Sequence, residues 1–206
     1  MNSNDYCKLF NEAITEYHKL DRVDQAFKNS YDYNESPLEY LLYKKNWIDT
    51  VQWHLEDLIR HPEINSEEAL ILKRKIDKSN QERTDMVEFI DSFYLKSFDA
   101  VKTKQNAKIN TESPAWAIDR LSILMLKIYH MKEESLRETA SPEHRSSCVD
   151  KLNVLEEQKK DLVIAINELI TDIVAGNKYM KVYKQMKMYN DQELNPVLRS
   201  SKKIHK

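Results

Sequence analysis

The sequence predicts an all-α fold, a single helical bundle of five to six long, mostly antiparallel helices. Three observations predict it: one glycine among 206 residues, three Ser-Pro pairs with the form of helix starts, and apolar residues that recur at helical spacing. Many-stranded β folds need frequent glycine turns, and nucleotide-binding loops and nucleophile elbows need glycine where the backbone approaches a phosphate or turns sharply. Gly176 alone cannot supply these turns, so the sequence excludes these classes.

The first two helices are delimited by apolar spacing and by proline. Apolar residues at helical spacing define the first helix, expected over residues 5–28: Cys7, Phe10, Ile14 and Tyr17. Ser36 followed by Pro37 gives an N-cap and a proline at the first helical position, where its missing N–H has no intrahelical partner to lose. The helix that starts there is expected to run to about Arg60, because Pro62 disfavours continuation.

The remaining helices are predicted from the same features. Acidic residues follow Asn65 in the first turn of the third helix, where they complement the helix dipole. Gly176 is suited to a left-handed cap at the end of the fifth helix. Tyrosine and methionine residues predict a shorter sixth helix. The expected ranges are 66–98, 114–138, 142–176 and 179–189, with a polar loop over 100–112.

We expect one domain over residues 1–190 and a basic C-terminal tail over residues 191–206. The chain has 32 basic and 34 acidic residues and no basic stripe, which argues against nucleic-acid binding. The N-terminal segment lacks the apolar core of a secretory signal, and no apolar run approaches the roughly 20 residues that cross a bilayer. Cys7 and Cys148 form no CxxC pair. These features predict a cytoplasmic protein without a transmembrane segment.

Two of the predicted helices carry cations inside their apolar stripes. Arg83 lies on the same helical line as Val87 in the third helix. An unpaired buried guanidinium is too costly to persist, so Arg83 requires carboxylates or an anionic ligand. Residues 121–131 are apolar almost all the way round, which predicts a helix enclosed by others. Arg120 and Lys127 share one side of that helix and must either reach solvent or pair with acids.

Three blocks of the sequence contain these residues: Trp53-His54-x-Glu56-Asp57-x-x-Arg60, Lys73-Arg74-x-Ile76-Asp77-x-x-Asn80-Gln81-x-Arg83-x-Asp85-x-x-Glu88-x-x-Asp91, and Pro114-x-x-x-Ile118-Asp119-Arg120-Leu121-Ser122-Ile123-Leu124-x-Leu126-Lys127-Ile128-Tyr129-His130-Met131. In spacing and identity they resemble a bacterial family catalogued as domain of unknown function 4254, most strongly over residues 40–135. Genes of that family often lie beside glycosyltransferases of lipopolysaccharide or capsule synthesis. The resemblance therefore implies a connection with cell-surface glycan synthesis, and it implies no particular reaction.

The polar residues of these blocks are compatible with a buried ion network or with an anion pocket. The network would fix the register of the helices, and its members would be Asp57, Asp77, Arg83, Asp119 and Arg120. The pocket would bind phosphate or carboxylate, because the arginine fork suits oxyanions. Its ligand-binding residues would be Asn80, Gln81, Arg83, Asp119, Arg120 and Lys127. In such a pocket His54 is the natural general acid or base, oriented by Asp57 or Glu56.

A metal site is a third arrangement with weaker support. His54, Asp57 and His61 fall at positions i, i+3 and i+7 of one helix. Di-iron bundles, however, need Glu-x-x-His on two helices, and this chain has only the reversed order in His130 and Glu133. We therefore predict neither a metal nor a cofactor.

The function that we expect is that of a ligand-binding or enzymatic accessory factor of cell-surface glycan biosynthesis, acting on a phosphorylated or otherwise anionic small molecule. The alternative is a non-catalytic interaction protein whose buried polar residues are a structural network. The pocket requires a solvent-reachable cavity lined by Arg83 and Arg120, whereas the network requires both guanidinium groups to be sealed and matched by Asp57 and Asp119. Long amphipathic helices would also permit a homodimer.

Overall fold

The computed structural model describes residues 1–185, 188 and 191–201 of the chain. Its helices and strands are α1 (Ser3–Tyr17), α2 (Pro37–Leu58), α3 (Ser66–Ser97), β1 (Lys108–Ile109), α4 (Pro114–Leu136), α5 (Pro142–Val174), β2 (Lys178–Tyr179) and α6 (Pro196–Ser201). The two short strands pair in parallel and are the only strands among the described residues. The predicted all-α bundle is confirmed.

The predicted starts of the long helices are confirmed, and they depend on local chemistry. Proline occupies the first position of α2, α4 and α5. The Asn65 side chain accepts a hydrogen bond from the Glu68 N–H at 2.8 Å, which caps α3. Ser113 and Ser141 cap α4 and α5 in the same way. These signals involve residues three positions apart, so the sequence was sufficient to locate them.

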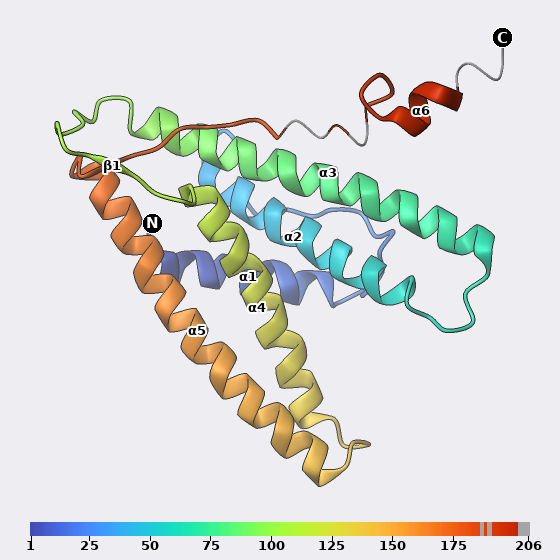
Figure 1. Cartoon of the computed structure of the whole chain (residues 1–206). Helices are drawn as coiled ribbons and strands as arrows, with labels where there is room; N and C mark the ends of the chain where they lie inside the picture. The colour runs from blue at the N-terminus through green and yellow to red at the C-terminus, as the bar shows by residue number, and fades with distance from the viewer. Residues whose placement is uncertain (186–187, 189–190, 202–206) are drawn as a thin grey trace.

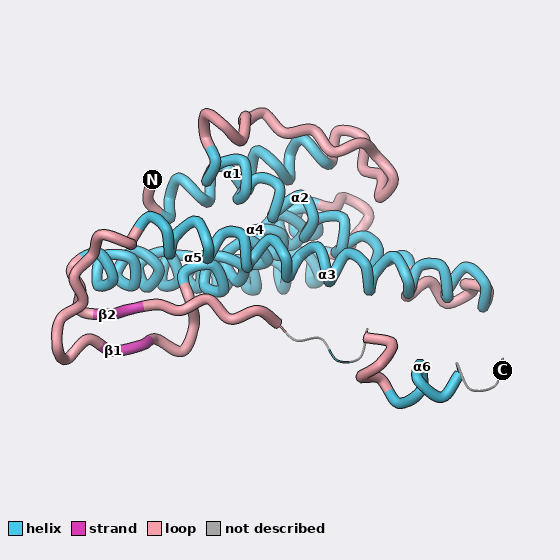
Figure 2. Tube along the Cα trace, turned by 90° about the horizontal axis from the view of Figure 1, so that it is seen from above, coloured by secondary structure: helices cyan, strands magenta, loops and turns pink. Residues whose placement is uncertain are grey.

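The first helix is shorter than predicted. It ends at Tyr17, because Asp21 adopts the left-handed conformation with φ of +52° and donates its N–H to the Tyr17 carbonyl at 3.0 Å. Residues 19–36 then return along the bundle, so α1 and α2 run in the same direction and are joined by a long connection (Figures 1 and 2).

The expected sixth helix over 179–189 is also wrong in its first part. Lys178 and Tyr179 form β2, which pairs with Lys108 and Ile109 of the predicted polar loop. Residues 186–187 and 189–190 lie outside the described residues. The expected basic tail contains the short helix α6, and residues 202–206 are again outside the described part.

Helix α4 lies at the centre of the arrangement and contacts α1, α2, α3 and α5. In Figure 1, α2 and α3 run antiparallel, and the antiparallel pair α4–α5 crosses them obliquely. This central position confirms the expectation from the apolar sequence of residues 121–131. Within the described residues, no helix has the length and apolar character that crossing a membrane requires.

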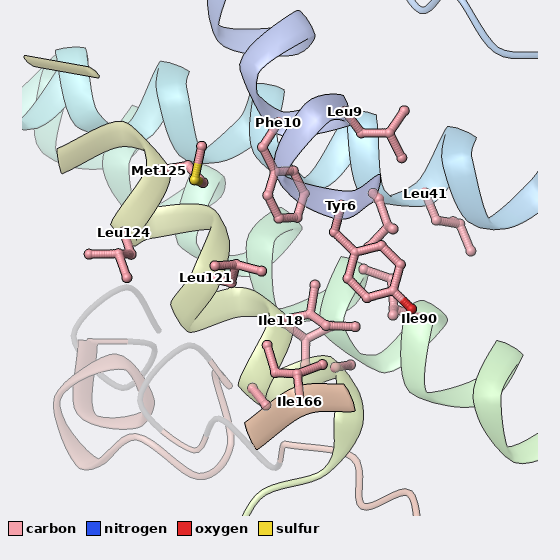
Figure 3. Packing of buried hydrophobic residues seen from close by; sticks show 14 of the residues in the cluster. Tyr6, Leu9, Phe10, Leu41, Ile90, Ile118, Leu121, Leu124, Met125 and Ile166 are labelled. Atoms are coloured by element: carbon pink, nitrogen blue, oxygen red, sulfur yellow. The ribbon is translucent and has the colours of Figure 1, made fainter. Parts of the chain in front are cut away.

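The hydrophobic core fixes the rotation of α4 about its axis. Figure 3 shows Tyr6 and Phe10 of α1 directed towards Ile118 and Leu121 of α4, with Ile166 of α5 beside them. Each of these side chains is at most 1% exposed. Because this apolar side of α4 is buried in the core, its polar positions face α2, α3 and α5.

Candidate functional site

Four charged residues from three helices form a buried cluster: Lys45 and Asp49 of α2, Arg83 of α3 and Asp119 of α4. The Lys45 ammonium contacts Asp49 and lies 2.8 Å from Asp119 Oδ1. Arg83 donates from Nε to Asp119 Oδ1 at 3.1 Å and from Nη2 to Asp119 Oδ2 at 2.7 Å. The side chains of Lys45 and Asp49 are fully buried, and that of Asp119 is 6% exposed. Each buried charge therefore has an opposite charge beside it, as burial requires.

Neutral polar groups complete one side of the cluster. Ser122 of α4 donates to Asp49 Oδ2, and Asn46 of α2 donates to Ser122 Oγ at 2.9 Å. The other oxygen, Asp49 Oδ1, lies 3.2 Å from Arg83 Nε but makes no hydrogen bond of good geometry within the described residues. The Asp49 carboxylate is therefore less well satisfied than that of Asp119.

The two carboxyl groups consequently have opposite proton affinities. Burial, together with the nearby charge of Asp119, raises the pKa of Asp49 and outweighs the attraction of Lys45 and Arg83. Burial also acts to raise the pKa of Asp119, but the positive charges of Lys45 and Arg83 hold that pKa below its usual value. Asp49 is thus the first of the pair to take up a proton. With that proton bound, the cluster carries one net positive charge.

A cavity of about 650 Å³ opens beside this cluster, between α3, α4 and α5. Its walls are formed by Arg83, Asp119, Arg120, Ile123, Leu124, Lys127, Gln158, Asp161, Leu162 and Ala165. The Arg83 side chain is 30% exposed, and its Nη1 makes no hydrogen bond within the described part of the chain. Arg120 is 62% exposed and lies 3.1 Å from Glu112. One nitrogen of a firmly held guanidinium therefore remains available to a ligand.

The structure brings together only part of the predicted pocket. Arg83, Asp119, Arg120 and Lys127 share the cavity. Asn80 and Gln81 lie on α3 but do not belong to the described cavity wall, and Gln81 donates to Asp85 at 2.7 Å. The predicted catalytic residues His54 and Asp57 lie elsewhere, and the described wall does not include them.

Of the five residues expected in the ion network, Arg83 and Asp119 belong to the buried cluster and the other three do not. Asp57 is exposed, Asp77 pairs with Lys73, and Arg120 pairs with Glu112 near the surface. The buried positions belong to Lys45 and Asp49, which sequence reasoning missed. The sequence could have indicated them, because Lys45 and Asp49 are four residues apart on the apolar side of α2, in line with Leu41.

His54 lies in a second polar cluster, with His18 at the end of α1 and His130 on α4. The Nε2 atoms of His54 and His18 are 3.2 Å apart, and the three rings each offer a nitrogen within 4.8 Å of the others. Tyr17 stacks on His54 with ring centroids 5.1 Å apart, and Trp53 stacks on His130 at 5.0 Å. The stacking holds these two imidazoles in place.

Of the residues considered from the sequence for a metal site, His54 and His130 belong to the converging group, whereas Asp57, His61 and Glu133 do not. His61 is exposed beyond the end of α2, where its Nδ1 accepts a hydrogen bond from the Glu63 N–H at 3.3 Å. His130 and Glu133, which form the reversed motif, contact each other, with His130 Nδ1 3.1 Å from Glu133 Oε2. The group that converges is His18, His54 and His130.

Comparison with known proteins gives one match. No curated protein and no solved structure matches the chain significantly. The family model described as "Protein of unknown function (DUF4254)" matches residues 39–182, which include the buried ion cluster, all of the cavity wall and two of the three clustered histidines. The match covers well over half of the chain, and the protein belongs to this family.

Proposed function

We propose that the protein binds an anionic, phosphorylated small molecule in the cavity between α3, α4 and α5. The observation that carries this proposal is the position of Arg83, which is held on one side by two carboxylates and faces the cavity on the other. A guanidinium fixed in this way loses little conformational entropy when it binds a ligand. The cavity volume of about 650 Å³ suits a ligand of nucleotide-sugar or sugar-phosphate size.

The charges around the cavity favour an anion. Arg83, Arg120 and Lys127 supply three cations, while Asp161 and Asp119 supply two acids. Asp119 is already neutralised by the fully buried Lys45 and by Arg83. Burial raises the pKa of Asp49, which lies behind the cavity in the same cluster. An entering phosphate group thus meets cationic donors from Arg83, Arg120 and Lys127, of which Arg120 also pairs with Glu112.

The biological role that we propose is that of a cytoplasmic ligand-binding or enzymatic accessory factor in cell-surface glycan biosynthesis. This part rests on the family to which the chain belongs, because genes of that family often lie beside glycosyltransferases of lipopolysaccharide or capsule synthesis. The free state of Cys7 and Cys148 agrees with a reducing compartment. Nucleotide sugars, sugar phosphates and polyprenyl phosphates all carry the phosphate that the cavity would recognise.

The test measures thermal melting of the protein with inorganic pyrophosphate, a nucleotide sugar and a sugar phosphate. A ligand present at 100 times its dissociation constant stabilises the fold by about 2.7 kcal/mol, which raises the melting temperature of a chain of this size by about 5–10 °C. Lys127→Gln should remove most of this shift without changing the melting temperature of the free protein, because Lys127 is exposed. Lys132→Gln, an exposed change on the same helix away from the cavity, is the matched control.

The alternative function is that of a non-catalytic interaction protein. The observation in its favour is that Lys45 and Asp49 are sealed from solvent, as a structural network requires. This alternative predicts that none of the three phosphates shifts the melting temperature and that Lys127→Gln behaves like Lys132→Gln. That result would refute the anion pocket.

A further inference from the structure

The three histidines of the second cluster come from parts of the chain that are far apart in sequence. His18 follows α1, His54 lies on α2 and His130 lies on α4. Their side chains are 10%, 20% and 20% exposed, so the cluster lies just beneath the surface. Three imidazoles so close together repel one another when protonated, and neutral imidazole is the form that binds transition metals.

Hydrogen bonds at the outer nitrogens set the tautomers. His18 Nδ1 lies 2.7 Å from the Ile14 carbonyl oxygen, which can only accept, so Nδ1 carries the proton and Nε2 presents a lone pair. His130 Nδ1 faces the Glu133 carboxylate at 3.1 Å, which likewise leaves Nε2 without a proton. His130 Nε2 is buried and has no hydrogen-bond partner among the described residues. The ring nitrogens that point into the cluster are thus prepared to act as acceptors.

These outer contacts are the ones that metal-binding histidines make. Such residues almost always donate their second ring N–H to a backbone carbonyl or to a carboxylate, which orients the ring and increases the basicity of the ligand nitrogen. His18 has the first kind of partner and His130 the second.

The distance between two of the ligand atoms also fits a metal ion. Zinc–nitrogen bonds of about 2.0–2.1 Å at tetrahedral angles place two ligand nitrogens about 3.3 Å apart. The Nε2 atoms of His18 and His54 are 3.2 Å apart. A hydrogen bond from a protonated His54 Nε2 would give a similar distance, but it would leave His130 Nε2 unsatisfied. A shared cation satisfies all three nitrogens.

We propose that His18, His54 and His130 bind a divalent transition metal ion, with zinc as the best fit to three imidazole ligands. Nitrogen-rich sites of this kind suit zinc, copper or nickel, and they disfavour magnesium and calcium, which prefer oxygen ligands. The site lies outside the wall of the anion cavity, and its occupancy does not depend on the proposed function.

The fourth coordination position faces Asp21. One carboxylate oxygen of Asp21 lies 3.5 Å from His54 Nε2 and 4.0 Å from His18 Nε2, and the side chain is 56% exposed. Its left-handed φ of +52° is unusual for a residue other than glycine and brings this carboxylate to the cluster immediately after α1. Asp21 can therefore complete the coordination or accept a hydrogen bond from a metal-bound water. Three protein ligands and an accessible fourth position describe a site that exchanges water.

The test measures zinc binding to the full chain after treatment with a chelator and dialysis. Competition against a chromogenic chelator should give one zinc ion per chain, with a dissociation constant below about 1 µM. Substitution by Co²⁺ should give the visible absorption of a four-coordinate, nitrogen-ligated ion. Replacing His54 or His130 by glutamine should weaken binding at least about 100-fold, whereas His61→Gln should leave it unchanged, because His61 is exposed and apart from the cluster.

A second variant distinguishes loss of the metal site from loss of the fold. Glu133→Gln changes a carboxylate that is 54% exposed, so the helix content should remain, and it should weaken zinc binding about 10-fold through His130. The proposal would be overturned if the wild-type chain bound no stoichiometric zinc, or if the His54→Gln and His130→Gln variants bound zinc as tightly as the wild type. Lys127→Gln should bind zinc normally, so failure of the anion pocket and failure of the metal site are separate results.

Discussion

Arg83 of α3 and Asp119 of α4 form a two-point ion pair, with Nη2 2.7 Å from Oδ2 and Nε 3.1 Å from Oδ1. Both residues also line the cavity between α3, α4 and α5. The ion network and the anion pocket, which are alternatives at the level of sequence, therefore share the same guanidinium. Its inner side neutralises buried carboxylates, and its outer side is exposed to solvent.

Replacing Arg83 by methionine should destabilise the fold by about 3–5 kcal/mol, because Asp119 and Asp49 are then left with Lys45 as their only opposite charge in the cluster. Urea unfolding followed by circular dichroism measures this change. Arg120→Met, at an exposed pair with Glu112, should cost less than about 1 kcal/mol. Equal effects of the two substitutions would show that Arg83 is not part of a buried network.

Asp49 and Asp119 should make opposite contributions to the pH dependence of stability. The folded-state pKa of Asp49 is raised by burial above its ordinary value of 3.8, so the folded state binds its proton more tightly than the unfolded state does. The free energy of unfolding contributed by Asp49 therefore rises as the pH falls towards 3.8. The pKa of Asp119 is lowered by its cationic neighbours, so its contribution is complete above 3.8 and is lost as the pH falls below it.

Two substitutions separate these contributions. Asp49→Asn resembles the protonated form, and its own contribution does not change with pH. As the pH falls from 7 to 4, the unfolding free energy of the wild type should therefore rise relative to that of this variant. Asp119→Asn removes the better-paired carboxylate from two cations and should cost about 3–5 kcal/mol at pH 7. Urea unfolding across this pH range measures both, and an Asp49→Asn difference that is independent of pH would contradict the assignment.

Gly176 ends α5 in the left-handed conformation, with φ of +71°, as its position predicted. A Cβ at this residue would lie 2.5 Å from the Lys102 carbonyl oxygen. Gly176→Ala should therefore destabilise the fold by more than about 1 kcal/mol, through backbone strain and displacement of the loop that contains β1. Thermal melting measures the change, with the exposed Ala175→Ser as control. An unchanged melting temperature would show that the loop does not pack on Gly176.

Asp91 of α3 caps the start of α4 across the helix interface. Its carboxylate accepts a hydrogen bond from the Ala115 N–H at 3.0 Å and another from Ser113. Asp91→Ala should cost about 1–3 kcal/mol, because a buried donor at the helix start loses its partner. Asp91→Asn should cost less, since its amide oxygen can still accept from Ala115. Urea unfolding measures both changes, and exposed Ser92→Ala should have little effect.

Much of the fold could be predicted because the deciding interactions are local. The starts at Pro37, Pro114 and Pro142 depend on proline at the first helical position, and those at Pro114 and Pro142 also on serine caps within three residues. The cap at Gly176 depends on the conformational freedom of glycine. The end of α1 could not be predicted, because the apolar spacing continues beyond Tyr17 while Asp21 turns the backbone. The strand pairing of Lys178 with Lys108 likewise joins segments that are far apart in the chain.

The candidate site likewise has features that the sequence predicts and features that only the tertiary structure decides. The sequence by itself determined that Arg83 must face negative charge, because a guanidinium inside an apolar stripe is too costly without it. Only the tertiary structure decided that its partners are Asp119 and Asp49, since this depends on how α2 and α4 are rotated against α3. The convergence of His18, His54 and His130 depends on the packing of three helices, and no spacing within one helix could reveal it. Local chemistry sets which groups need partners, and long-range packing sets which partners they meet.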